Sequence, residues 1–476
     1  MSTTLSSLVP AGHFLGVSLI LPRDGRFLYG LRPARLEGER QVVQITGIGG
    51  GVEADDVSFA AAAQREALEE IGCSVRIGDC PETVVVRGRH DVQTVKAAAV
   101  PPPANQRRLR SKRHHLLLLL AIVPLGLCLL GSGLSALSNL TLPDPPPSTG
   151  RLDPLDKARL AETLHLKEAL GETVWPGWGT ADIPILLWNR DDAFLVNYPN
   201  QPAGWSLVSG DTFQDQPYYR QPASKTENFT VQIGQVWVAS MATKWETDTF
   251  FREQLQSLFP PVIEQVFPYR LLIMPSEVQM TGVLHESFHA YQAQVALARL
   301  QDAEEAYAQA AAYWAADSGM ADDWEAEIEW LIAAANAGSD DEATQLARQF
   351  LQQRAGRRER LPASLISYER RLEWLEGLAK YVEVAIWRQA AESATYQPLP
   401  AVTEDADFRG YTTFDQRWSQ EISQLRRQAR LEGEVRFYYT GLVMGFVLDR
   451  LSPDWKSQIL AGGVWLETLL EEAVSP

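Results

Sequence analysis

The feature that most limits how this chain can fold is an uncharged apolar stretch of 22 residues, LLLLLAIVPLGLCLLGSGLSAL, from Leu116 to Leu137. About 20 apolar residues are enough for a helix to cross the hydrocarbon core of a bilayer. Five basic residues lie in 107–113 just before it, and the segment after it carries one acid and no base. By the positive-inside rule, this pattern predicts a single-pass membrane protein with a cytoplasmic N-terminus and an extracytoplasmic C-terminal part.

A buried core helix and a cleaved signal peptide are the alternatives for this stretch. Its length exceeds the 7–15 residues usual for the apolar region of a signal peptide, which favours an uncleaved anchor at 116–137. The Pro-rich and basic residues 101–115 are then expected to be a juxtamembrane linker. The Pro-rich residues 138–150 are expected to be a stiff spacer.

The charge and the cysteine content of the chain exclude some classes of function and structure. Beyond residue 113 the chain holds 28 basic and 48 acidic residues, and the net charge of the whole sequence is −17. Such an excess of acid repels phosphate backbones, so we exclude nucleic acid as a partner of the C-terminal part. The cysteines, at Cys73, Cys80 and Cys128, leave that part without disulfides and dependent on a large core.

The first hundred residues carry a hairpin pattern followed by an acidic helix. Two apolar runs flank Asp24-Gly25, a turn signal. Ser58 is a plausible N-cap for a helix over FAAAAQREALEEI, and spacings of three and four put Glu66, Glu69 and Glu70 on one face of it. Clustered carboxylates are favourable around a hard divalent cation such as Mg²⁺, whereas a solvated acidic face is the alternative.

The residues around this helix resemble the Nudix box: Gly51, thirteen further residues, then REALEEIGC at 65–73. The resemblance implies an α/β sandwich that hydrolyses nucleoside diphosphates linked to another group, with magnesium held by Glu66, Glu69 and Glu70. Only 42 residues separate Cys73 from the apolar stretch, too few for the remaining strands and helix of that fold. We therefore expect an incomplete Nudix-like segment over 1–100.

The predicted secondary structure of the C-terminal part changes from strands to helices along the chain. Residues 183–275 hold short apolar runs, among them IPILLWN, AFLVNYP, FTVQIGQVWVASMA and YRLLIM, separated by Pro, Gly, Asn and Asp, which predicts strands. Ala-, Glu- and Leu-rich stretches follow and predict helices at 281–315, 321–337, 340–355, 363–392, 414–429 and 434–451.

The candidate metal ligands and the candidate general base lie together in the run GVLHESFHAYQA. His285 and His289 are four residues apart in a predicted helix, so both imidazoles face the same way and can bind one Zn²⁺. Glu286 lies beside them, where it can take a proton from a zinc-activated water. Two core histidines with an incidental glutamate are the alternative interpretation.

A catalytic zinc site needs a third protein ligand. The run LEGLAKY at 375–381, in a second predicted helix, together with HESFH resembles the gluzincin subgroup of zincin metallopeptidases. The resemblance implies that Glu376 is the third ligand and Glu286 the general base. Glu373, one turn earlier, is an alternative ligand or a supporting residue. Under the same resemblance, the run QVWVASMA before the metal helix corresponds to the edge strand that aligns the substrate.

A tyrosine often stabilises the oxyanion in such sites. Tyr381, Tyr438 and Tyr439 are the candidates, and the segment Tyr438–Gly441 has the more loop-like composition.

Together these patterns predict a multi-domain chain. We expect an incomplete Nudix-like α/β segment, a transmembrane helix, and an α+β zincin-like domain over 151–476 that is mostly helical in its C-terminal half. The expected function is a membrane-anchored, outward-facing zinc hydrolase, a peptidase acting on peptides or proteins. The alternatives are a magnesium-dependent Nudix hydrolase, and a binding protein without enzymatic activity on a zincin scaffold.

Overall fold

The computed structural model describes residues 137–140, 142, 149–223, 227–460 and 462–475, together with short strands before residue 97. The chain divides into two compact units, Met1–Ile122 and Val123–Pro476. The strands of the first unit pair antiparallel as β1–β2, β3–β6, β4–β5 and β7–β8. They are β1 (Pro22–Arg23), β2 (Arg26–Phe27), β3 (Gly30–Leu31), β4 (Arg35–Glu37), β5 (Arg40–Val42), β6 (Ile45–Thr46), β7 (Thr83–Arg87) and β8 (Val92–Lys96).

Little else of the Nudix-like prediction can be followed in the structure. Arg23 pairs antiparallel with Arg26, as the predicted hairpin requires, and the turn residues between them lie outside the described residues. The acidic helix with Glu66, Glu69 and Glu70, and with it the magnesium site, lies outside the described residues.

The predicted transmembrane helix requires a correction. Among the described residues, no helix is both long and apolar enough to cross a membrane. Helices α3 (Pro154–Val174), α6 (Ser276–Glu305) and α9 (Asp340–Arg358) have the length, but charged and polar side chains recur along them. For the described chain, the predicted membrane-spanning fold class is therefore wrong. The predicted single-pass location with an extracytoplasmic C-terminal part depended on that helix and is wrong with it. Residues 116–136 themselves lie outside the described chain.

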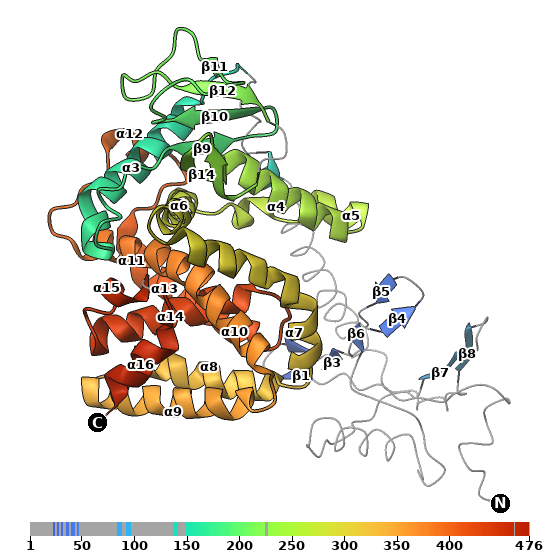
Figure 1. Ribbon diagram of the computed structural model, residues 1–476. Helices are drawn as coiled ribbons and strands as arrows, with labels where there is room; N and C mark the ends of the chain where they lie inside the picture. Colours follow the sequence, from blue (N-terminus) through green and yellow to red (C-terminus); the bar gives the residue numbers. More distant parts are fainter. Residues whose placement is uncertain are drawn as a thin grey trace, which may run out of the picture. The chain divides into compact units, whose positions relative to one another are not determined.

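The second unit contains one mixed six-stranded sheet (Figure 1). Its order is β11-β12-β10-β9-β14-β13, and all neighbours are antiparallel except the parallel pair β9 and β14. The strands are β9 (Ile185–Trp188), β10 (Asp192–Val196), β11 (Ser206–Leu207), β12 (Tyr219–Pro222), β13 (Phe229–Ile233) and β14 (Val236–Ala242). The run QVWVASMA is thus β14, one strand inside the edge, and β13 is the edge strand.

The segment between the sheet and α6 differs from the β-like prediction. It forms α4 (Lys244–Leu258), α5 (Pro261–Val266) and the 3-10 helix η2 (Tyr269–Leu272). The Thr243 side chain accepts a hydrogen bond from the Glu246 N–H, which caps the first turn of α4. The predicted strand over YRLLIM is therefore wrong: its first four residues form a short helical turn after Pro268.

Helices make up the rest of the unit, and their positions agree closely with the predicted stretches (Figure 1). After α6 come η3 (Ala306–Gln309), α7 (Ala310–Asp317), α8 (Ala321–Ala335), α9, α10 (Ala363–Leu372), η4 (Glu373–Gly377), α11 (Leu378–Glu392), α12 (Pro400–Thr403), η5 (Tyr411–Thr413), α13 (Phe414–Gln428), α14 (Val435–Leu451), α15 (Lys456–Ile459) and α16 (Leu466–Val474). A single large apolar core joins these helices to one face of the sheet.

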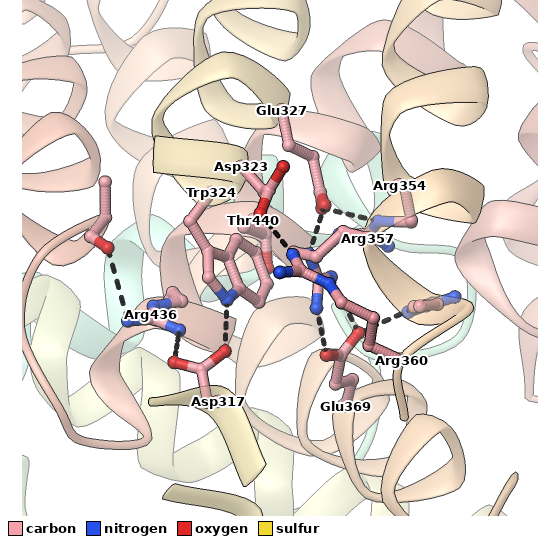
Figure 2. Close-up of polar contacts among 12 residues, drawn as sticks. Asp317, Asp323, Trp324, Glu327, Arg354, Arg357, Arg360, Glu369, Arg436 and Thr440 are labelled. Carbon is pink, nitrogen blue, oxygen red and sulfur yellow. Dashed lines mark hydrogen bonds and ion pairs between the residues drawn. The ribbon is translucent and has the colours of Figure 1, made fainter. Parts of the chain in front are cut away.

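A buried ionic network ties the helices together (Figure 2). Arg357, on α9, is fully buried and contacts Glu327 of α8 at 2.7 Å and Glu369 of α10 at 2.6 Å. Arg354, one turn earlier, contacts Glu327 at 2.7 Å and Glu373 of η4 at 2.7 Å. Because removing one partner would leave a charge buried without compensation, the network makes the mutual arrangement of α8, α9, α10 and η4 strongly specified.

Candidate metal centre

Helix α6 supplies the first half of the centre. It keeps helical geometry through the HESFH motif and departs from it further on, at Ala296, and Phe288 and Ala290 are fully buried, so the helix is fixed against the core at the motif. The spacing of four brings His285 and His289 to the same face, with Nε2 atoms 3.2 Å apart. Their exposed fractions are 7% and 0%, and that of Glu286 is 9%, so all three lie inside the protein.

The second half comes from η4, a π-helical turn between α10 and α11. Glu376 lies in this turn, with Oε2 3.2 Å from His289 Nε2 and 3.4 Å from His285 Nε2. One ligand atom from each of the three residues lies within 4.8 Å of the others, an arrangement that could hold a metal ion. Single π-turns inside helices occur often at functional sites, and here the turn carries the carboxylate that closes the cluster.

Each histidine also has a partner at its other ring nitrogen. His289 Nδ1 lies 2.9 Å from the side-chain oxygen of Gln292, whose amide donates to the Trp374 carbonyl. His285 Nδ1 lies 3.3 Å from Oε2 of Glu383, on α11, within ion-pair distance but without the geometry of a hydrogen bond. Since both Nδ1 atoms face an acceptor, the proton is favoured there and the Nε2 lone pairs are directed at the point between the three side chains.

Glu383 is itself held by two cations. Lys380 donates to its Oε1 at 2.7 Å, and Arg417 of α13 donates to the same oxygen at 2.6 Å. The carboxylate therefore stays ionised and aligned beside His285. Sequence reasoning missed Glu383, although it lies seven residues after Glu376, two helical turns along one face.

Three aromatic side chains surround the cluster. Tyr307, on η3, donates a hydrogen bond to Glu376 Oε1 at 2.8 Å. The ring of Tyr438 stacks on His285, with centroids 5.8 Å apart, and burial together with the charge of Glu376 raises the pKa of its hydroxyl. Phe229, at the start of the edge strand β13, packs against His289 at 4.8 Å. The edge strand, η3 and the start of α14 thus meet at the cluster.

Burial and charge together perturb the titration of the site. Burial alone would lower the pKa of His285, but the carboxylates of Glu376 and Glu383, 3.4 and 3.3 Å from its ring nitrogens, raise it to about 10. Burial alone would raise the pKa of Glu376, yet His289 and His285 hold it well below its usual range. Burial raises the pKa of Glu286 to about 7, and one of its carboxylate oxygens has no hydrogen-bond partner among the described residues.

The structure shows which of the other candidate residues, Glu373 and the three tyrosines, lie at the cluster. Glu373 points away from the histidines into the ionic network, where Arg354 and Thr440 bind it. Tyr381 donates to Asp449 at 2.6 Å, and Tyr439 lies against Lys380. Of the three candidate tyrosines, Tyr438 faces the cluster, from a helix rather than a loop.

The donor set matches what a zinc ion requires. Two imidazole nitrogens and one carboxylate oxygen are common ligands of catalytic zinc. In the absence of a metal, the raised pKa of His285 keeps a proton among these three groups, and a zinc ion would take the place of that proton. His285, His289 and Glu376 would be the ligands.

Comparison with known proteins adds no further assignment: no protein-family model, curated protein or solved structure matches this chain. An inference about its function therefore rests on the geometry of the cluster formed by His285, His289 and Glu376.

Proposed function

We propose that the second unit is a zinc-dependent hydrolase that cleaves amide bonds of peptides or proteins. The observation that carries this proposal is the convergence of His285, His289 and Glu376 within 4.8 Å, with Glu286 beside them. The zincin-like pattern of HESFH and LEGLAKY supports the same chemistry.

Bound zinc would supply a Lewis acid for the substrate carbonyl and lower the pKa of a water. Glu286 would accept a proton from the attacking water and return it to the leaving nitrogen, so that hydroxide adds to the carbonyl carbon as the C–N bond breaks. Its buried position, and an oxygen with no hydrogen-bond partner among the described residues, suit a group that takes up and releases a proton at the reacting water.

The two tyrosines of the cluster have separable roles. Tyr307 donates to Glu376 and would hold that ligand in place. Tyr438 stacks on His285 and would offer its hydroxyl to the developing negative charge on the substrate oxygen.

The zinc content of the purified full-length chain tests the proposal. We expect one zinc per chain in the wild type, and loss of it in His285→Ala and in Glu376→Ala. His165→Ala is the matched control, because this imidazole stacks on Tyr396 away from the cluster and should not change the zinc content. A folded wild type that contains no zinc under metal-replete conditions would contradict the proposal.

The low exposure of the ligands favours a second candidate, a closed metal site in a binding protein without catalytic activity. Structural zinc sites are closed, whereas catalytic sites keep a position for water or substrate. The two candidates differ in one measurement: if zinc is bound but Glu286→Gln leaves every peptide-hydrolysing activity unchanged, the metal has a structural role.

A further inference from the structure

Two glutamates close in sequence to the tyrosines of the metal cluster carry negative charges that belong to no metal ligand and no ion pair in the part of the chain that the structure describes. Glu304, near the end of α6, and Glu434, just before α14, are half-buried. Neither side chain has a hydrogen bond or an ion pair with the described residues. Partly buried carboxylates without a partner are unfavourable in a resting protein, which makes them candidates for contact with a ligand.

Each of these glutamates lies one helical turn from a tyrosine of the cluster. Glu304 comes one turn before Tyr307, the donor to Glu376, and the charges of His289 and Glu376 both act on its carboxyl. Glu434 comes one turn before Tyr438, and its charge acts on the hydroxyl of Tyr307. The two acids therefore flank the two tyrosines.

The cations next to Glu383, on the other side of His285, are already paired. Lys380 and Arg417 are both engaged by Glu383 and Glu421. A divalent ion on the histidines would be balanced by Glu376 and Glu286. The negative charges of Glu304 and Glu434 would then have no positive charge among the described residues to balance them.

A third observation points to a ligand at this place. Glu286 is nine-tenths buried, one of its carboxylate oxygens has no hydrogen-bond partner among the described residues, and the charges of His285, His289, Glu376 and Glu383 all act on this carboxyl. Tyrosine rings beside carboxylates also bind ammonium and guanidinium groups well, because the ring face attracts cations.

We propose, on the basis of the proposed hydrolase function, that this site selects peptides that carry a positive charge next to the bond to be cleaved, and that Glu304 and Glu434 determine this specificity. The charge is either a lysine or arginine side chain or the N-terminal ammonium group of the peptide. Both present the same chemistry to a pair of carboxylates.

Peptide binding without turnover tests the inference. The probe protein is the zinc-loaded full-length chain with Glu286→Gln, and the readout is fluorescence anisotropy. The ligands are four dye-labelled pentapeptides of alanine: three with blocked ends and a central Lys, Gln or Glu, and one with central Gln and a free N-terminus. We expect the Lys peptide to bind at least about fivefold more tightly than its Gln counterpart, since a partly buried ion pair contributes on the order of 1 kcal/mol.

Charge-neutral variants identify the residues responsible. Adding Glu304→Gln and Glu434→Gln should reduce the preference for Lys over Gln to less than about twofold. Adding Glu472→Gln, on α16, should leave it unchanged, because that helix supplies no residue to the site. If the peptide with a free N-terminus binds as tightly as the Lys peptide, the recognised charge is the N-terminal ammonium; if only the Lys peptide binds tightly, it is the side chain.

Equal binding of Lys and Gln peptides, no binding of any peptide, or a preference that survives the double substitution would overturn the inference. Each of these results leaves the zinc content of the wild type untouched. The absence of zinc would instead overturn the hydrolase proposal, so the two failures are distinguishable.

Discussion

Gly377 and Gly441 lie in backbone contact where η4 crosses α14. A Cβ atom built on Gly377 would stand 2.6 Å from the Cα of Gly441, and one built on Gly441 would stand 2.5 Å from the Cα of Gly377. Gly377 directly follows the metal-site residue Glu376, and Gly441 lies three residues after Tyr438. The close crossing is what brings these two functional side chains together from separate helices.

Gly377→Ala should therefore destabilise the protein and weaken zinc binding. The added methyl meets backbone rather than a flexible side chain, so the two helices must separate, at a cost of about 1–3 kcal/mol. Gly356→Ala is the control: it lies on α9 with no atom within 4 Å of an added Cβ, and replacing a helical glycine should stabilise by about 0.5–1 kcal/mol. Denaturant unfolding of both variants checks the prediction, which fails if they behave alike.

Glu286→Gln should retain zinc and lose turnover. The amide has nearly the shape of the carboxylate but cannot accept the proton, so kcat on any peptide that the wild type cleaves should fall by about 10²–10⁴. The measurement pairs zinc content with steady-state kinetics. Unchanged kcat in a zinc-loaded variant would remove Glu286 from the role of general base.

Glu383→Gln should weaken zinc binding without removing a ligand. The carboxylate beside His285 Nδ1 increases the basicity of the ring, and loss of such a partner typically costs about 10–100-fold in metal affinity. Glu421→Gln serves as control, because it contacts the same Lys380 and Arg417 but not His285. Competition with a chelator gives both affinities; similar losses in the two variants would contradict a role for Glu383 in orienting His285.

Arg357→Met should be strongly destabilising. It leaves the fully buried Glu327 and Glu369 without one of their cations, and breaking a buried pair typically costs about 3–5 kcal/mol. Arg426→Met removes a pair with Glu329 whose side chains are about half exposed, and should cost less than about 1 kcal/mol. Thermal and denaturant unfolding compare the two, and equal losses would argue against a structural role for the network.

Asp156 should make stability decrease as the pH rises through weakly acidic values. Burial raises its pKa from 3.8 to about 6 in the folded state, despite Arg159 at 3.2 Å. At pH 5 the folded form thus binds a proton that the unfolded form has released. The stabilisation is complete below about pH 4 and is lost as the pH passes 6.

The corresponding variant is Asp156→Asn, whose amide does not titrate. The full shift is equivalent to about 3 kcal/mol, so between pH 4 and 7 the unfolding free energy of the wild type should fall relative to that of the variant by up to this amount. Parallel pH profiles for the two proteins would contradict the prediction.

Local patterns in the sequence were enough to predict the helices and part of the site. The helical stretches near 321–337, 340–355 and 414–429 match α8, α9 and α13 within a few residues. The pairing of His285 with His289 depends only on helical periodicity, because side chains four residues apart share a face. In contrast, the apolar run YRLLIM was assigned to a strand, since a short apolar run has no period of its own.

Only the tertiary structure determined which carboxylate completes the cluster. Glu373 and Glu376 lie three residues apart, so helical spacing does not separate them. The π-turn and the buried Arg354 separate them: Arg354 binds Glu373, and Glu376 is left to meet His289 across 87 residues of chain. The positions of Tyr307, Glu383 and the edge strand β13 likewise follow from packing. Contacts of this kind depend on how distant elements meet, whereas the period of a helix is a property of neighbouring residues alone.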